Sequence, residues 1–120
     1  MMSRVPGYIA FGVRDLAVSR RFWREGLGLV PAGEWPGQLA LSAGGFDILL
    51  DATGEIAPAP GIEIAIHLTR ADLDGAVAEL AAIGHRCFRG PKDFGGPNGF
   101  EAAFRDPDGV LVTLFTGAPA

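Results

Sequence analysis

The sequence has few residues of the kinds that mark several classes of protein. Cys87 is the only cysteine among 120 residues, so neither an internal disulfide nor a cysteine-rich metal site can form. No apolar run approaches the roughly 20 residues of a membrane span, and the first residues lack the apolar segment of a secretory signal. We therefore expect no membrane association, and the single cysteine favours a cytoplasmic location.

Basic residues are also scarce. Lys and Arg number 10 against 14 Asp and Glu, which gives a net charge of −4, and the basic residues are scattered along the chain. Nucleic-acid binding needs a basic face, so we expect no nucleic-acid partner. Glycine and proline are abundant instead, at 18 and nine residues, and they predict many turns and short strands rather than a helix bundle.

The first half of the chain has the pattern of one strand, one helix and further strands. Asp15 is a plausible helix N-cap, and Gly26 and Gly28 are typical of a helix end. The prolines after the helix exclude a central strand there. The predicted elements are a strand over 8–13, a helix from Asp15 to Gly26, a loop or short edge strand over 30–37, and strands over 38–43 and 46–51 joined by Gly44–Gly45.

The second half repeats this pattern. Its predicted elements are a strand over 62–68, a helix capped by Asp72 and ended by Gly84, a short strand over 86–89, a loop over 90–99, and a closing hairpin of 100–105 and 110–115. The hairpin turn is Asp106-Pro107-Asp108-Gly109, in which Gly109 accepts a positive φ. The chain is thus expected to be a single α+β domain, 1–120, with two βαβββ modules over 1–55 and 56–120.

Three motifs at this spacing resemble the vicinal oxygen chelate superfamily, which includes glyoxalase I, the bleomycin resistance proteins and the extradiol dioxygenases. They are the first-helix segment 13–29, the second-helix segment 72–84 and the closing-hairpin segment 104–109. The resemblance implies two βαβββ modules that form a cupped mixed sheet around a cleft, and it implies a homodimer. It leaves the reaction open, because this fold hosts several chemistries and some proteins that only bind.

Metal-dependent members of that superfamily take their ligands from cleft-facing strand residues. The corresponding positions here hold Tyr8, Ala65 and Thr113, with a fourth near Leu49; a register shift of two would replace Ala65 by Glu63. None of the first three is a usual ligand of Zn, Ni or Fe, which needs about three converging donors. We therefore predict no metal and no other cofactor, with a divalent metal as the alternative.

The candidate ligand-binding residues are Tyr8, Trp35, Glu63, His67 and Thr113. Tyr8 either bonds a ligand or packs at the rim of the cleft, and Trp35, in a loop, either stacks on a ligand or folds back on the core. His67 and Glu63 either form a polar pair that orients a ligand or lie on a solvated strand face.

Other residues have simpler interpretations. Trp23 is expected in the core or at a dimer contact, and Cys87 as a small buried apolar residue. Glu101 and Arg105 are expected to form an ordinary cross-strand charged set. Residues 94–99 have the composition of either a flap over the cleft or an irregular loop.

Three functions remain open from the sequence. The favoured one is a metal-free protein of the bleomycin-resistance type that holds a small aromatic or amphipathic molecule in an apolar cleft. The alternative, which the resemblance implies, is a glyoxalase-type lyase, isomerase or dioxygenase that uses a divalent metal, or a metal-free variant with Glu63 or His67 as acid or base. The third is an interaction module without a ligand.

Overall fold

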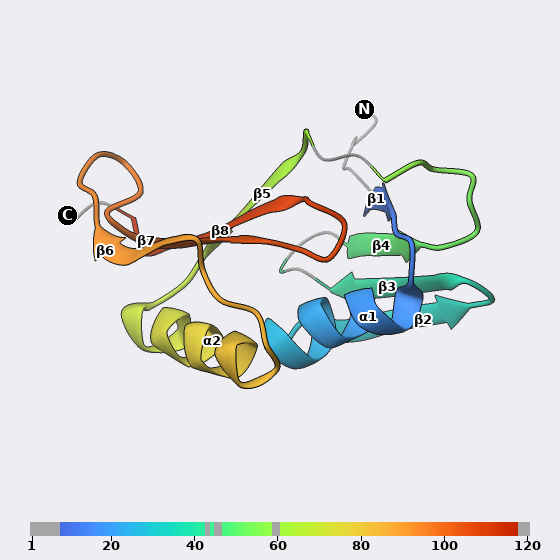
Figure 1. Ribbon diagram of the computed structural model, residues 1–120, viewed down its shortest axis with the longest axis horizontal. Coiled ribbons are helices and arrows are strands. Elements are labelled where there is room, and N and C mark those ends of the chain that lie inside the picture. The colour runs from blue at the N-terminus through green and yellow to red at the C-terminus, as the bar shows by residue number, and fades with distance from the viewer. Residues whose placement is uncertain (1–7, 43, 45–46, 59–60, 118–120) are drawn as a thin grey trace, which may run out of the picture.

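The computed structural model describes residues 8–42, 44, 47–58 and 61–117 (Figure 1). In chain order the elements are β1 (Tyr8–Gly12), α1 (Leu16–Arg20), the π-helix η1 (Arg21–Gly26), β2 (Val30–Trp35), β3 (Gln38–Ser42), β4 (Asp47–Asp51), β5 (Glu63–His67), α2 (Arg70–Ala82), β6 (Arg89–Asp93), β7 (Phe100–Arg105) and β8 (Leu111–Phe115). This is the predicted α+β fold of two βαβββ modules. The predicted Gly44–Gly45 turn lies partly outside the described residues.

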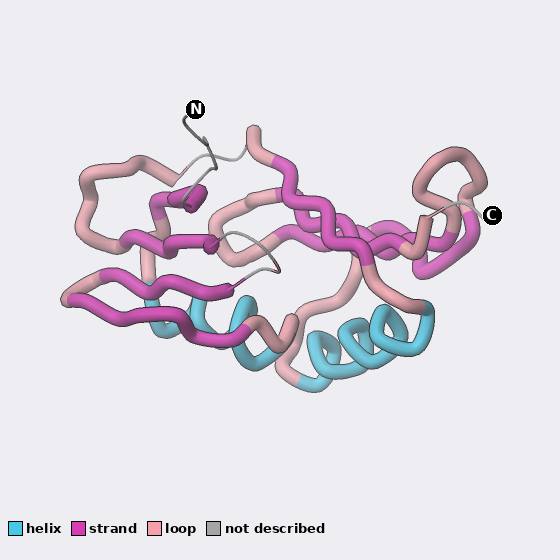
Figure 2. Tube along the Cα trace, turned by 180° about the vertical axis from the view of Figure 1, so that it is seen from behind, coloured by secondary structure: helices cyan, strands magenta, loops and turns pink. Residues whose placement is uncertain are grey.

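Each module has its own four-stranded mixed sheet. The strand orders are β1-β4-β3-β2 and β5-β8-β7-β6. The first strand of each module runs parallel to the last, and the other pairs are antiparallel. Helix α1 packs on β3 and β4, and α2 packs on β7. Figures 1 and 2 show both helices along the same side of the molecule, so each sheet has one covered and one open face.

The first helix begins as predicted. The Asp15 side chain accepts hydrogen bonds from the backbone N–H groups of Ala17 and Val18, at 3.0 and 3.2 Å. The helix then continues without a break as η1, whose Phe22 and Trp23 are fully buried. Trp23 is therefore a core residue.

The predicted cap of the second helix is wrong. Thr69 is the N-cap, and its hydroxyl accepts a hydrogen bond from the Asp72 N–H at 3.2 Å. Asp72 instead lies in the first turn, where a carboxylate is favourable beside the helix dipole. Both residues are typical of helix starts, and only the backbone places the boundary at Thr69.

The predicted boundary between 86–89 and 90–99 is also wrong. Strand β6 covers Arg89–Asp93 and includes Gly90 and Pro91, which the sequence assigns to a loop. All five of its residues are exposed, and its pairing with β7 is irregular between Arg89 and Lys92. Glycine and proline are tolerated there because β6 is an edge strand with a bulge.

The turn between β7 and β8 joins the two modules. Asp106 accepts the Asp108 and Val110 N–H groups at 2.9 and 2.8 Å, and Gly109 has a φ of +93°, as predicted. The same carboxylate accepts the indole N–H of Trp23 at 3.2 Å. The turn is therefore anchored in the first module's helix.

A second aspartate in the turn strengthens this anchor. The Asp108 carboxylate accepts from the Ser19 hydroxyl at 3.2 Å and from the backbone and guanidinium N–H groups of Arg14, both at 3.1 Å. Asp108 is buried, so these bonds satisfy a charge that would otherwise be costly.

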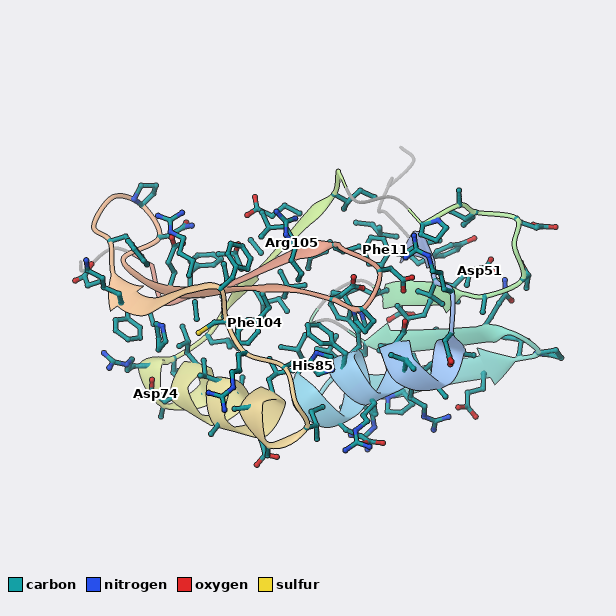
Figure 3. The ribbon with its side chains drawn as sticks, viewed as in Figure 1. Phe11, Asp51, Asp74, His85, Phe104 and Arg105 are labelled. Atoms are coloured by element: carbon teal, nitrogen blue, oxygen red, sulfur yellow. The ribbon has the colours of Figure 1, made fainter. Side chains whose placement is uncertain are left out.

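Alternation along the strands separates the core from the open faces. Phe104 is fully buried between β7 and α2, whereas Arg105 extends to the other side of the same strand (Figure 3). One continuous apolar core, which includes Phe11, Trp23 and Phe104, lies under both sheets. The residues on the open faces are thus free to form a site.

Candidate functional site

The open face of the first sheet carries a hollow of about 290 Å³, here called the first hollow. It is lined by Tyr8, Trp35, Gln38, Ala40, Asp47 and Leu49. Strand register explains the set, because Ala10, Leu49 and Ala40 lie opposite one another across β1, β4 and β3. Small and apolar residues thus form the floor, and larger side chains stand around it.

The two aromatic residues of the first hollow are unusually exposed. Tyr8 is 62% and Trp35 55% exposed, although both rings are large. Trp35 ends β2, so of the two alternatives for residues 30–37 the short edge strand is confirmed and the loop is wrong. The Trp35 ring packs over Gly33, where an added Cβ would lie 2.6 Å from the ring. A side chain at residue 33 would displace the indole, so glycine keeps the ring flat against its own strand, beside the hollow.

The open face of the second sheet carries a more polar hollow of about 270 Å³, here called the second hollow. It is lined by Glu63, Phe88, Arg89, Asn98, Glu101, Ala103, Arg105, Leu111 and Thr113. Its floor repeats that of the first sheet, because Ala103 on β7 lies opposite Thr113 on β8 as Ala40 on β3 lies opposite Leu49 on β4.

Two carboxylates define the polar character of the second hollow. Glu63 accepts a hydrogen bond from the Thr113 hydroxyl at 2.9 Å. Glu101 is only 6% exposed and accepts from Asn98 at 3.0 Å, with Arg89 at 3.3 Å. The partner of Glu101 is therefore Arg89 across the strand pair, and Glu101 is a buried pocket residue rather than an ordinary surface charge.

His67 stands apart from both hollows. Its Nε2 lies 2.9 Å from the carbonyl oxygen of Thr116, and its ring contacts that of Phe115 at 5.2 Å between centroids. It makes no hydrogen bond to Glu63 among the described contacts, so of the two alternatives for these residues the polar pair is not formed. His67 instead lines a groove of about 400 Å³ along β5, together with Leu29, Ser42, Gly44, Ile48, Ile64, Ala65 and Ile66.

The structure thus divides the five predicted site residues. Tyr8 and Trp35 line the first hollow, Glu63 and Thr113 line the second, and His67 lies in neither. Sequence reasoning missed Gln38 and Ala40 in the first hollow and Phe88, Arg89, Asn98, Ala103 and Leu111 in the second. Strand alternation would have identified Gln38, Ala40 and Ala103 if the register of the strand pairs had been known.

Other residues near the hollows have structural roles. At the end of β4, the hydroxyl and N–H of Thr53 and the side chain of Gln38 bond to Asp51 and hold the pKa of its carboxyl below its usual value. Cys87 is half-buried, and its thiol donates to the Gly90 carbonyl at 3.1 Å. The segment 94–99 closes on itself through a bond from the Phe94 N–H to the Gly99 carbonyl.

The side chains present do not fit a metal ion held by three donors. Within residues 8–42, 44, 47–58 and 61–117, no three His, Cys, Asp or Glu side chains lie close enough together for one ion. Equivalent pairings in the two modules match Tyr8 with Glu63 and Leu49 with Thr113. The register shift of two residues, to Glu63, therefore gives the position equivalent to Tyr8, and Ala65 is equivalent to Ala10.

Comparison with known families agrees with this fold. The glyoxalase/bleomycin resistance protein/dioxygenase superfamily model matches residues 6–114. The chain belongs to this superfamily. A comparison with curated proteins gives no match.

Several solved structures of similar proteins share the fold of this glyoxalase/bleomycin resistance superfamily member. A glyoxalase-related enzyme from Fulvimarina pelagi superposes with a TM-score of 0.77 at 21% identity, over 96% of this chain and 88% of that one. TnmS3, an antibiotic binding protein from Streptomyces sp. CB03234, gives 0.76 at 22%, over 98% and 100%. The integron cassette protein VCH_CASS1 from V. cholerae gives 0.73 at 23%, over 97% of both chains. At these identities the likeness shows the fold alone. No helix in the described part of the chain is long and apolar enough to cross a membrane.

Proposed function

We propose that this superfamily member is a metal-free binding protein that holds a small aromatic or amphipathic molecule against its open sheet faces. The observation that carries the proposal is the first hollow, where the exposed rings of Tyr8 and Trp35 stand over a small apolar floor. Large exposed aromatic side chains beside a concavity are typical of ligand sites, because covering them removes apolar surface from water. In this hollow the polar groups that would orient the ligand are Gln38 and Asp47, whereas Glu63 and Thr113 would contact a ligand in the second hollow.

We further propose that a second copy of the chain completes the cleft. Each hollow is slightly smaller than the roughly 300–1,000 Å³ of common small-molecule pockets. Two hollows brought together by a symmetric homodimer would reach that size. Sedimentation equilibrium tests the proposed dimer. A mass of 12.5 kDa, that of one chain, at micromolar concentration would contradict the dimer but would leave the proposed ligand site in the first hollow standing.

Among the described strands β5 has an open edge, which supports the dimer. Strand β5 bonds to β8 through the Ile62 carbonyl and the Leu68 N–H, so the intervening alternate residues Glu63, Ala65 and His67 direct their backbone groups to the open edge. The apolar groove beside this edge and the exposed Ile9 on β1 offer surface that a second copy would bury.

A matched pair of bicyclic alcohols tests the proposed function. We expect 2-naphthol to raise the melting temperature of the protein, because a ligand that binds only the folded state stabilises it, whereas saturated decahydro-2-naphthol gives a smaller shift. Differential scanning fluorimetry over a concentration series measures both.

Two variants assign the effect to the first hollow. Trp35→Ala should remove most of the 2-naphthol shift, while Phe94→Ala, which changes another exposed ring outside both hollows, should leave it intact. An unchanged shift in Trp35→Ala would contradict the proposed site. A stoichiometric divalent ion in protein purified without chelator would favour the glyoxalase-type enzyme instead.

A further inference from the structure

We infer that the second hollow recognises a small zwitterion of dipeptide size, with Glu63 binding its cationic group and Arg105 its anionic group. The inference deepens the proposed function and rests on it, since the zwitterion would be the ligand, or the polar part of the ligand, that the open faces hold. Both residues line the same hollow.

The register places the two charges on opposite sides of one apolar residue. Leu111 on β8 lies opposite Glu63 on β5 and opposite Arg105 on β7. Because neighbouring strands are about 4.8 Å apart, the Cα atoms of Glu63 and Arg105 are separated by roughly 10 Å across the open face. The side chains therefore stand as two opposite walls above Leu111.

Neither charge is neutralised by another residue that the structure describes. The one hydrogen bond to the Glu63 carboxylate comes from the uncharged Thr113 hydroxyl. Arg105 donates to the Gly109 carbonyl at 3.3 Å, and its guanidinium lies 5.4 Å from the centre of the Phe88 ring. The four ion pairs among the described residues include neither side chain.

The other two charged residues of the second hollow, Glu101 and Arg89, neutralise each other. Glu101 is buried and held by Arg89 and Asn98, so both charges of that pair are already matched. The second hollow therefore has one satisfied ion pair and two unmatched charges of opposite sign. A ligand with a single charge would match one wall and leave the other unmatched, whereas a zwitterion matches both.

Size and shape agree with a dipeptide. The hollow has a volume of about 270 Å³, and its floor includes Ala103 and Thr113, whose small side chains leave room above the sheet. The two Cα atoms of a dipeptide are about 3.8 Å apart, so its charged ends lie somewhat farther apart than that and fit between side chains rooted roughly 10 Å apart.

Glycyl-L-phenylalanine and its two blocked forms test the inference by isothermal titration calorimetry. The free dipeptide carries both charges, the N-acetyl form only the carboxylate, and the C-terminal amide only the ammonium group. We expect the free dipeptide to bind roughly tenfold more tightly than either blocked form, since one charge-assisted hydrogen bond is lost in each. The difference should shrink as salt is added.

Charge-removing variants should change the preference one end at a time. Glu63→Gln should abolish the preference for the free dipeptide over its N-acetyl form and keep the preference over the amide, and Arg105→Gln should do the reverse. Glu79→Gln and Arg24→Gln, which make the same changes on exposed helix positions, should behave as wild type. Melting temperatures confirm that each variant folds.

Three results would overturn the inference, and the third separates it from the proposed function. If the blocked forms bind as tightly as the free dipeptide, or if the two variants leave their ranking unchanged, the charges do not select the ligand. If none of the three binds while 2-naphthol still raises the melting temperature, the zwitterion is wrong and the proposed function stands. If 2-naphthol also fails, both are wrong.

Discussion

At the scale of single residues, Asp106 of the closing turn is buried and has a shifted pKa. Burial raises the pKa of its carboxyl, although hydrogen bonds from Val110, Asp108 and Trp23 act in the opposite direction. A carboxyl whose pKa is raised on folding holds its proton more tightly in the folded state. Its contribution to the free energy of unfolding is therefore present below about pH 4 and is lost as the pH rises through the raised pKa.

This predicts a pH dependence of opposite sign for two aspartates. The free energy of unfolding of wild type, relative to that of Asp106→Asn, should fall as the pH rises from about 4 to about 7. For Asp51, whose pKa is lowered chiefly by the Thr53 hydroxyl, the contribution is present above about pH 4 and is lost as the pH falls below that.

Urea unfolding of wild type, Asp106→Asn and Asp51→Asn from about pH 2 to about pH 7 measures both slopes. The advantage of wild type over Asp51→Asn should grow as the pH rises to about 4 and then level off, whereas that over Asp106→Asn should decline above about pH 4. Slopes of the same sign would contradict the assignment of burial as the main effect on Asp106.

At the scale of elements, the start of α2 gives the sharpest test of a local assignment. Thr69→Ala removes the hydroxyl that accepts the Asp72 N–H and should lower the free energy of unfolding by about 1 kcal/mol. Asp72→Asn keeps the cap and loses only an interaction with the helix dipole, so it should cost about 0.3 kcal/mol. Urea unfolding at neutral pH compares them. If Asp72→Asn lost as much free energy of unfolding as Thr69→Ala, or more, Asp72 rather than Thr69 would be the N-cap.

Element boundaries show where the sequence is informative and where it is not. Asp15 and Gly109 are predicted correctly because each acts through its own neighbouring backbone. Thr69 is missed because Asp72 is an equally typical cap residue, and β6 is missed because it tolerates Gly90 and Pro91 only as an exposed edge strand. The same holds for Glu101, whose burial comes from pairing with Arg89 and Asn98 rather than from its own sequence context.

At the scale of the whole molecule, two modules are fixed against each other by a small polar cluster. Asp106 and Asp108 of the closing turn bind Trp23, Ser19 and Arg14 of the first module. The helices η1 and α2 also approach each other closely at Gly26, where an added Cβ would lie 2.3 Å from the Leu80 side chain. The first module's residues are thereby held in a defined position relative to the closing hairpin.

The two-module fold follows from the repeated strand and helix pattern, whereas the division of the site does not. The sequence placed Tyr8, Trp35, Glu63, His67 and Thr113 in one cleft. The structure puts four of them in two separate hollows and leaves His67 on the β5 groove. Alternation predicts which side chains share a sheet face, but it carries no information on how two sheets are placed relative to each other.

The most direct measurement of the central claim is a ¹⁵N–¹H NMR titration with 2-naphthol that follows the two tryptophan indole signals. Trp35 is exposed in the first hollow, whereas Trp23 is buried and donates its indole N–H to Asp106. A Trp35→Phe variant assigns the two signals. The account predicts that 2-naphthol shifts the Trp35 signal progressively to saturation and leaves the Trp23 signal in place. A Trp35 signal that does not move at concentrations that stabilise the protein would contradict it.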